Sequence, residues 1–526
     1  MTVVRGGTIV DGTGRAGFAG DVVVDGDRIV DVVPGGGASY GDAQVIDATG
    51  SLVTPGFIDA HTHSDAYLVI EPDAPSKIAQ GITTEINGQC GGSAAPRYGE
   101  ARLSSDWAAI LGDRLTWRSL AEYREALDAA KPAVNTVQFI GHNTLRSSVV
   151  GYAARPSSPD ELRAMERMLE QALDEGGWGL TTGLIYQPGK YSVPVEVEAL
   201  ARVAAARGGF YATHMRSEGD AILESIDEVL GLVRATGIRA EISHLKTSGS
   251  RNWGKIDAVL EKIGNAVGEG LLLGSDRYPY CAAGTDLDVV LPEWAQEGAA
   301  KAETERLGDP ALRERIAAEI DASERDWSTV TVGGTWAEEN KHFSGKTIAE
   351  ILRSPGDGAV ARSPGELICR ILLLDGCKTG AFFFVMSEEN LAKIYSRPWI
   401  VPGSDASLRA PWGPLGADYP HPRAYATMPE FYRRVRALGF SREETVARMT
   451  SVPARRFDIA GRGVIERGAF ADIAVWKEDG FRAQATYVAP HRFASGISLV
   501  MVNGRIPYRD GTFTGDRGGR FLERKR

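Results

Sequence analysis

Short apolar runs alternate with helix-like stretches through the middle of the chain, and polar residues follow these runs. Apolar runs of this length between turn signals are typical of buried strands, and strands that alternate with helices favour a parallel sheet. The pattern therefore predicts an α/β fold in which eight strands close a TIM-like (β/α)8 barrel. The first predicted strand is an apolar run that contains Leu52, Val53, Phe57 and Ile58 and ends in His61-Thr-His63. The other seven span residues 82–86, 136–142, 178–185, 209–214, 239–244, 271–276 and 399–405.

Both ends of the chain have a different sequence pattern, in which short runs of Val and Ile are separated by Asp-Gly and Asn-Gly turns. These runs lie in the first fifty residues and return near residues 471–476 and 498–502. We predict that residues 1–53 and 459–526 form one composite β-sandwich beside a barrel of residues 54–458. Two unrelated β caps are the alternative.

A long segment, at about residues 286–398, separates the seventh predicted strand from the eighth. It is charged and predicts a helix over residues 309–325. Long insertions at the catalytic mouth of a barrel commonly act as lids or specificity elements. We expect an inserted lid segment here, with a surface decoration as the alternative.

Metal-binding residue types occur where the predicted strands end. His61 and His63 are two positions apart and therefore leave a strand end on one face. A pair of surface histidines would give the same local pattern, but Cys90, His214 and His244 end other strands. Strand ends meet at the mouth of a barrel, where active sites lie. Neutral imidazole and thiolate suit zinc and similar ions.

Two of the strand-end residues could carry more than one role. Cys90 lies between glycines, where a thiolate could bind and bridge metal ions; a small buried side chain is the alternative. Asp405 ends the eighth strand, where it could contact a metal and carry protons, or simply cap a helix. Amide hydrolysis needs a metal that activates water and a carboxylate that transfers its protons.

Composition excludes several classes of partner. The net charge is −10 and no basic block occurs, which disfavours nucleic acid and anionic membranes. No signal-peptide pattern follows Met1, and no apolar run is long enough to span a bilayer. The 4 cysteines give no disulfide framework. We therefore expect a cytoplasmic protein with a small-molecule partner.

The chain resembles the metal-dependent amidohydrolase superfamily, and within it the D-aminoacylase (N-acyl-D-amino-acid deacylase) group, over essentially its whole length. The motifs that carry the resemblance are Phe57-Ile-Asp-Ala-His-Thr-His63, Gly88-Gln-Cys-Gly-Gly-Ser93, Gly179-Leu-Thr-Thr-Gly-Leu-Ile-Tyr186, Tyr211-Ala-Thr-His-Met-Arg216, Ile242-Ser-His-Leu-Lys246, Tyr278-Pro-Tyr280, Gly403-Ser-Asp405, His421-Pro-Arg423 and Thr450-Ser-Val-Pro-Ala-Arg-Arg-Phe457.

This resemblance implies a role for each ligand-type residue. Cys90, His214 and His244 would hold a tight zinc ion, and His61 and His63 would contribute to a second, weaker position bridged by Cys90. Asp405 would be a metal contact and the general base and acid. Many superfamily members bridge their metals with a carbamylated lysine after the fourth strand, but that predicted strand contains no lysine here.

The resemblance also implies a group of substrate-binding residues. Arg423 matches the position that clamps the substrate carboxylate, which suits a guanidinium fork. A surface salt bridge is the alternative for this arginine. Gly284 stands where relatives often carry serine, so Thr285 could supply the hydroxyl. The remaining predicted substrate contacts are Tyr186, Lys246 and Tyr278.

Three further residues receive weaker roles. His142 ends the third predicted strand and could line the pocket or be structural. Glu218 and Asp220 follow His214 and could orient that histidine or Arg216.

The function that follows is zinc-dependent hydrolysis of N-acyl-D-amino acids to a carboxylic acid and a D-amino acid. One alternative is another amide, such as a cyclic amide, a dipeptide containing a D-residue or a carbamoyl compound. A catalytically inactive scaffold is disfavoured, because every metal-ligand position is filled. The sequence does not predict the number of bound metals or the oligomeric state.

Overall fold

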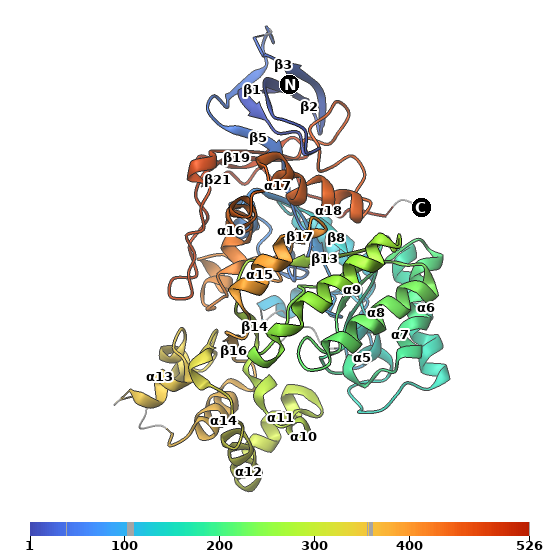
Figure 1. Cartoon of the computed structure of the whole chain (residues 1–526), viewed down its shortest axis with the longest axis vertical. Helices are drawn as coiled ribbons and strands as arrows, with labels where there is room; N and C mark the ends of the chain where they lie inside the picture. Colours follow the sequence, from blue (N-terminus) through green and yellow to red (C-terminus); the bar gives the residue numbers. More distant parts are fainter. Residues whose placement is uncertain (38, 102–109, 355, 357–360, 525–526) are drawn as a thin grey trace.

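A closed barrel of parallel strands forms the centre of the protein, as the sequence predicts (Figure 1). The computed structural model describes residues 1–37, 39–101, 110–354, 356 and 361–524. The third barrel strand is interrupted at Phe139 and is formed by β8 and β9. The barrel strands are β6 (Phe57–Asp59), β7 (Ile82–Asn87), β8 (Asn135–Gln138), β9 (Ile140–Gly141), β10 (Gly179–Gly183), β11 (Phe210–His214), β12 (Arg239–Ile242), β13 (Leu273–Arg277) and β17 (Ile400–Pro402).

The barrel closes where its first and last strands meet. Strand β6 pairs with β7 and β7 with β8, while β9 to β13 and β17 form the rest of the wall in parallel register. Between β6 and β17, Ala60 N donates to Pro402 O at 3.1 Å, and a single bridge joins Thr62 to Ala406. This seam has few hydrogen bonds, and it lies directly beside His61 and Asp405.

Helices cover the outside of the barrel, and their ends follow simple capping chemistry. Helix α6 (Pro159–Asp174) begins with a capping box between Ser158 and Glu161, and α8 (Ile222–Thr236) ends at Gly237 with a left-handed φ of 67°. Together with α7 (Pro194–Ala206) and α9 (Ile256–Gly268), they lie side by side along one side of the barrel (Figure 1). None of the described helices has the length and apolar character needed to cross a membrane.

The two ends of the chain build one nine-stranded sheet, which lies at the top of Figure 1. Strand β5 (Leu52–Pro55) joins the two halves, because it pairs in parallel with β1 (Thr2–Ile9) and antiparallel with β18 (Ile473–Trp476). Side chains from both halves share one apolar core. The exact domain boundaries stay a prediction. The other strands are β2 (Phe18–Asp25), β3 (Arg28–Pro34), β4 (Gln44–Asp47), β19 (Ile497–Val502), β20 (Arg505–Arg509) and β21 (Thr512–Phe513).

The inserted segment folds around an apolar cluster of its own, in which every member lies between residues 283 and 385. Its three-stranded antiparallel sheet lies beside the barrel and its helices extend away from it (Figure 1). The helix expected at 309–325 is α12 (Pro310–Asp321). The sheet strands are β14 (Ala283–Asp286), β15 (Val330–Val332) and β16 (Gly380–Phe383), and the helices are α10 (Glu293–Gln296), α11 (Ala299–Gly308), α12, α13 (Ile348–Arg353) and α14 (Pro364–Asp375).

A buried ion pair joins helices α5 (His142–Val149) and α7. Arg146 Nη1 lies 2.6 Å from Glu196 Oε2, and His142 Nε2 lies 2.8 Å from Glu196 Oε1. His142 therefore has a structural partner in Glu196. Burial alone would raise the pKa of Glu196, but hydrogen bonds from His142, Ser157 and Arg146 lower it to about 2.

We expect Glu196→Gln to lower the free energy of unfolding by about 3 kcal/mol at pH 7, because Arg146 is left buried without its partner. The folded-state pKa of Glu196 is depressed, so its contribution is present at neutral pH. It is lost as the pH falls from about 4.5 through about 2. Urea unfolding of both proteins at several pH values would measure this. A difference in stability that stays constant down to pH 2 would contradict the assignment.

Candidate metal centre and active site

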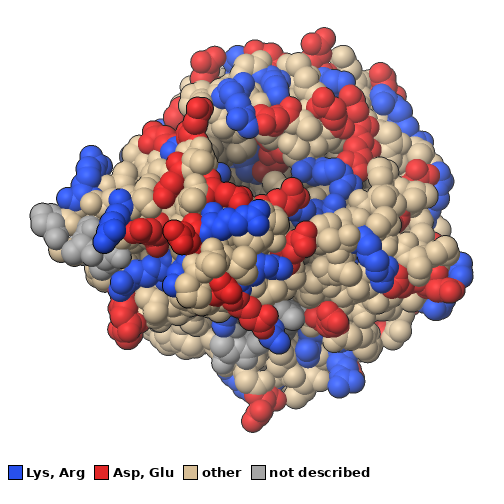
Figure 2. Space-filling model, turned by 90° about the horizontal axis from the view of Figure 1, so that it is seen from below, with Lys and Arg blue, Asp and Glu red and all other residues tan. Residues whose placement is uncertain are grey.

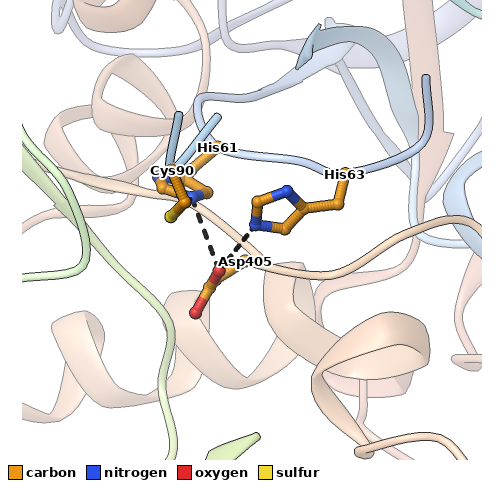
Figure 3. A group of neighbouring side chains, drawn as sticks. All are labelled: His61, His63, Cys90 and Asp405. Carbon is orange, nitrogen blue, oxygen red and sulfur yellow. Dashed lines mark hydrogen bonds and ion pairs between the residues drawn. The ribbon is translucent and has the colours of Figure 1, made fainter. Parts of the chain in front are cut away.

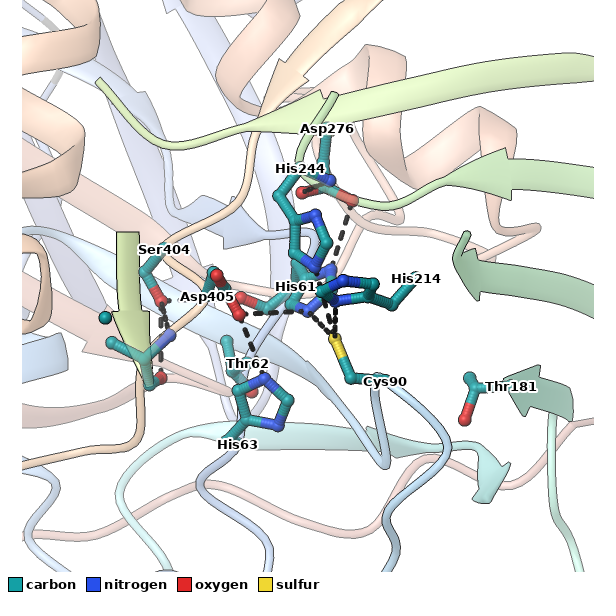
Figure 4. A network of polar contacts seen from close by, with 12 residues as sticks. His61, Thr62, His63, Cys90, Thr181, His214, His244, Asp276, Ser404 and Asp405 are labelled. Atoms are coloured by element: carbon teal, nitrogen blue, oxygen red, sulfur yellow. Dashed lines mark hydrogen bonds and ion pairs between the residues drawn. The ribbon is translucent and has the colours of Figure 1, made fainter. Parts of the chain in front are cut away.

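Six side chains from the ends of five barrel strands meet at the mouth of the barrel (Figures 3 and 4). They form two groups with ligand atoms within 4.8 Å of one another, and Cys90 belongs to both groups. The first group is His61, His63, Cys90 and Asp405, and the second is Cys90, His214 and His244.

Cys90 lies at the centre of this cluster. Its Sγ is 3.3 Å from His61 Nε2, 3.3 Å from His244 Nε2 and 3.8 Å from His214 Nδ1. Burial alone would raise the pKa of the Cys90 thiol, but the charges of His61 and His244 outweigh burial and hold it well below its usual value. The surroundings of Cys90 therefore favour a thiolate, which is the metal-binding form of cysteine.

Asp405 is held on both of its oxygens. Its Oδ1 lies 3.0 Å from His63 Nε2 and 3.4 Å from His61 Nε2, and its Oδ2 accepts a hydrogen bond from Arg423 Nη1 at 2.7 Å. Burial alone would raise the pKa of Asp405, but Arg423 and His244 lower it well below the usual value. The carboxylate is therefore ionised over the neutral range.

The backbone is strained at three members of the cluster. Cys90, His244 and Asp405 have φ angles of 52°, 38° and 50°, in the left-handed region that residues other than glycine rarely adopt. Such conformations cost on the order of 1–3 kcal/mol each and concentrate at functional sites. The loop of Cys90 also needs Gly88, since a Cβ there would lie 2.2 Å from Phe139 O.

Two buried carboxylates lie behind the histidines. Asp276 Oδ2 is 3.2 Å from His61 Nδ1, and its Oδ1 accepts the backbone N–H of His244 at 3.0 Å (Figure 4). Glu218 lies 2.9 Å from His244 Nδ1 and 3.4 Å from His214 Nε2. Carboxylates in this position fix the ring orientation and increase the basicity of a ligand histidine.

We expect Asp276→Asn to weaken metal binding by about 10–100-fold, because His61 loses the carboxylate that orients its ring. Competition with a coloured chelator would measure the affinity. Asp220→Asn is a suitable control, because Asp220 follows the same histidine-bearing strand as Glu218 but pairs with Arg251 at the surface. Unchanged metal affinity in Asp276→Asn would contradict this role.

The donor set fits a zinc-type metal. It contains one cysteine thiolate, several imidazole nitrogens and one carboxylate. Zinc takes these three kinds of ligand in proteins. Burial alone would lower the pKa of His63, but hydrogen bonds with Asp405 and Cys90 raise it to about 9. Protons therefore compete with a metal for this group, and metal binding would release them.

A cavity of about 650 Å³ opens in front of the cluster, between the barrel and the inserted segment. His63, Cys90 and Asp405 lie in its wall, together with Phe382 and Trp336 from the insertion. The face on the side of the insertion is hollowed, and residues of both charges surround the hollow (Figure 2).

The structure divides the predicted substrate-binding residues into two sets. Tyr186, Thr285 and Arg423 line the cavity. Tyr278 is fully buried beside the Arg423 guanidinium, which lies 4.7 Å from its ring centroid. Lys246 is buried behind the cluster, where its Nζ contacts Glu218 and lies 2.8 Å from His244 Nδ1. Neither of these two is among the residues that line the described cavity.

Sequence reasoning gave no role to Asp276, although it ends the seventh predicted strand in Gly-Ser-Asp. Its position at the end of a predicted strand, like that of the ligand histidines, could have indicated a role at the site. Of the two carboxylates that could orient His214 or Arg216, Glu218 lies close to His214. Asp220 pairs with Arg251 instead, and Arg216 pairs with Glu228.

Comparisons with known proteins agree with this arrangement. The family model described as the amidohydrolase family matches residues 44–508. The chain is 35% identical to N-acyl-D-glutamate deacylase of Alcaligenes xylosoxydans xylosoxydans, over 99% of this chain and 96% of that protein.

Solved structures show the same similarity in three dimensions. N-acyl-D-glutamate deacylase from Bordetella bronchiseptica, in complex with zinc and a phosphonate mimic of the tetrahedral intermediate, has a TM-score of 0.82 at 32% identity, with 99% of each chain covered. A D-aminoacylase with a binuclear metal centre, in which one metal activates and a second metal attenuates, also has a TM-score of 0.82 at 32% identity. The match covers 99% of each chain.

Proposed function

The chain belongs to the amidohydrolase family and groups with the D-aminoacylases, and on this premise we propose that it hydrolyses the amide bond of N-acyl-D-amino acids with the help of zinc. The observation that carries this proposal is the shared position of Cys90 between two ligand groups, with Asp405 facing one of them and the cavity. The products would be a carboxylic acid and a D-amino acid.

The tight zinc position would use Cys90, His214 and His244. A second, weaker position would use His61, His63 and Asp405, with Cys90 as the bridging ligand. Zinc supplies a Lewis acid for the amide carbonyl and lowers the pKa of a nearby water.

Asp405 would carry the protons of the reaction. Arg423 holds Oδ2 at 2.7 Å, which leaves Oδ1 directed at the histidines. From this position Oδ1 would accept a proton from the attacking water and then return it to the departing nitrogen. The low pKa of Asp405 keeps the carboxylate ionised at neutral pH, which is the form that can act as a base.

Arg423 would also bind the α-carboxylate of the substrate. Arg423 lines the cavity, and its five N–H groups exceed the two hydrogen bonds that it donates to Asp405 Oδ2 and Gly284 O. Tyr186 and Thr285 would contact the substrate from the cavity wall. Tyr278 and Lys246 would support Arg423 and His244 from behind.

The outer wall of the cavity favours a second negative charge on the substrate. Lys341 and Lys378 both line it, and neither forms an ion pair with a described residue. Lys341 Nζ donates to Thr335 O at 3.0 Å, and Lys378 Nζ lies 5.7 Å from the ring centroid of Trp336. We propose that an acidic group on the side chain or the acyl group is preferred.

Hydrolysis of paired N-acetyl-D- and N-acetyl-L-amino acids (Met, Leu, Phe, Glu and Asp) tests the proposal. We expect release from the D-substrates only, loss of release with a chelator and recovery with zinc. Lys341→Met with Lys378→Met should lower kcat/KM for the acidic D-substrates about fivefold relative to D-Met.

The outcomes separate the parts of the proposal. Equal turnover of both enantiomers would overturn the stereochemical assignment. Turnover of cyclic amides or D-containing dipeptides alone would keep the chemistry and replace the substrate. The cytoplasmic location stays a prediction.

A further inference from the structure

Lys77 is a fully buried lysine with no role in the proposed chemistry. It lies in α2 (Pro75–Ile78), a short helix between β6 and β7, and its side chain is 0% exposed. Lysine is almost never fully buried unless its charge is paired. It does not line the cavity, so its partners must account for its position.

The ammonium group of Lys77 holds the residues on both sides of Asp405. Nζ donates to Ser404 Oγ at 2.9 Å and to Ala406 O at 2.9 Å. An ammonium group has three N–H donors, so these two bonds leave one N–H that can donate to a carboxylate oxygen. The loop that carries Asp405 is therefore held at two points by one side chain.

Two buried carboxylates fix the ammonium in turn. Nζ lies 2.9 Å from Asp59 Oδ2 on β6 and 3.1 Å from Glu85 Oε1 on β7. Asp59 Oδ1 also accepts the backbone N–H of Ser404 at 2.7 Å. Lys77 thus connects the first two strands of the barrel to the loop after the last strand.

This connection acts at the seam where the barrel closes. The loop after β17 has no continuous ladder with β6, and Asp405 N donates to His61 O at 2.8 Å as one of few bonds there. Asp405 also has a left-handed φ of 50°, which L-residues keep only when their surroundings enforce it.

We infer that Lys77 is a positioning residue for Asp405: its ammonium holds the Ser404–Ala406 turn so that the carboxylate faces His63. The inference rests on the proposed function insofar as Asp405 carries protons. It assigns no contact between Lys77 and substrate or metal.

The test must separate positioning from folding. Lys77→Met alone leaves Asp59 and Glu85 buried without a cation, which can prevent folding. The main variant therefore combines Lys77→Met with Asp59→Asn and Glu85→Gln, which removes all three charges and keeps the side-chain sizes similar. Ser404→Ala is a milder variant that removes one acceptor of Lys77 and no charge.

The triple variant is expected to fold and to lose about 100-fold in kcat with little change in KM, because a small displacement of a reacting group has this effect. Ser404→Ala should lose less. Arg146→Met with Glu196→Gln removes another buried ion pair, whose two residues do not line the cavity, and should keep kcat. Unchanged kcat in the folded triple variant would overturn the inference.

Crystal structures of the metal-free wild type and triple variant give a readout that needs no turnover. We expect the distance between Asp405 Oδ1 and His63 Nε2 to increase beyond 3.0 Å in the variant. An unmoved Asp405 would overturn the inference even if kcat fell. If the wild type hydrolysed no N-acyl-D-amino acid, the proposed function would fail, and this comparison would still decide the role of Lys77.

Discussion

Replacing Asp405 with asparagine is expected to lower kcat by about a thousandfold while the protein folds and keeps its tightly bound metal. Asparagine has the same shape, so Arg423 and His63 keep a hydrogen-bonding neighbour. It cannot accept a proton from water at neutral pH or deliver one to the leaving nitrogen. The expected loss is therefore in kcat, since both proton transfers belong to the chemical steps.

Metal content distinguishes this loss from a failure to bind metal. Asp405 belongs to the group with His61 and His63, whereas the other group contains only Cys90, His214 and His244. The second group is intact in Asp405→Asn, so metal analysis should still find the tight ion. Asp257→Asn is a matched control, because Asp257 pairs with Lys393 at the surface. Full activity of Asp405→Asn would remove Asp405 from the mechanism.

The sequence predicted the barrel and the cluster because both are encoded locally. Each strand is a short apolar run, and a ligand such as His214 or His244 stands at the end of its own run. Once eight runs indicate a barrel, its topology brings these ends together. The family, the fold and an amide-hydrolysing enzyme rather than a scaffold are accordingly confirmed.

The supporting residues could not be predicted in the same way. Lys77 contacts Ser404 across 327 positions of the chain, and Asp276 contacts His61 across 215. No local period encodes such pairs, because barrel closure alone decides them. Lys246 shows the converse. The resemblance implied a substrate contact for this residue, whereas its side chain contacts Glu218 behind the cluster.

Cys90→Ala is expected to have the largest effect of any single change in the cluster. Among the residues that the structure describes, Cys90 alone belongs to both ligand groups, so its loss removes one ligand from each group. A zinc site that loses one of its few ligands loses much of its affinity, and activity should therefore fall by about 10⁴-fold. Adding zinc should not restore it.

His63→Ala provides the contrast that makes this prediction specific. His63 belongs to only one group, so that variant should keep the tight ion and lose the weaker position. Residue 90 has a left-handed φ, and alanine is strained there as cysteine is, so the substitution adds no new backbone effect. Cys369→Ala, which removes a buried thiol in the insertion, is the control. Metal analysis after dialysis, beside turnover, measures all three. A Cys90→Ala protein that retained one tight zinc ion would show that tight binding does not need the sulfur, and the four histidines and Asp405 would then have to hold the ion.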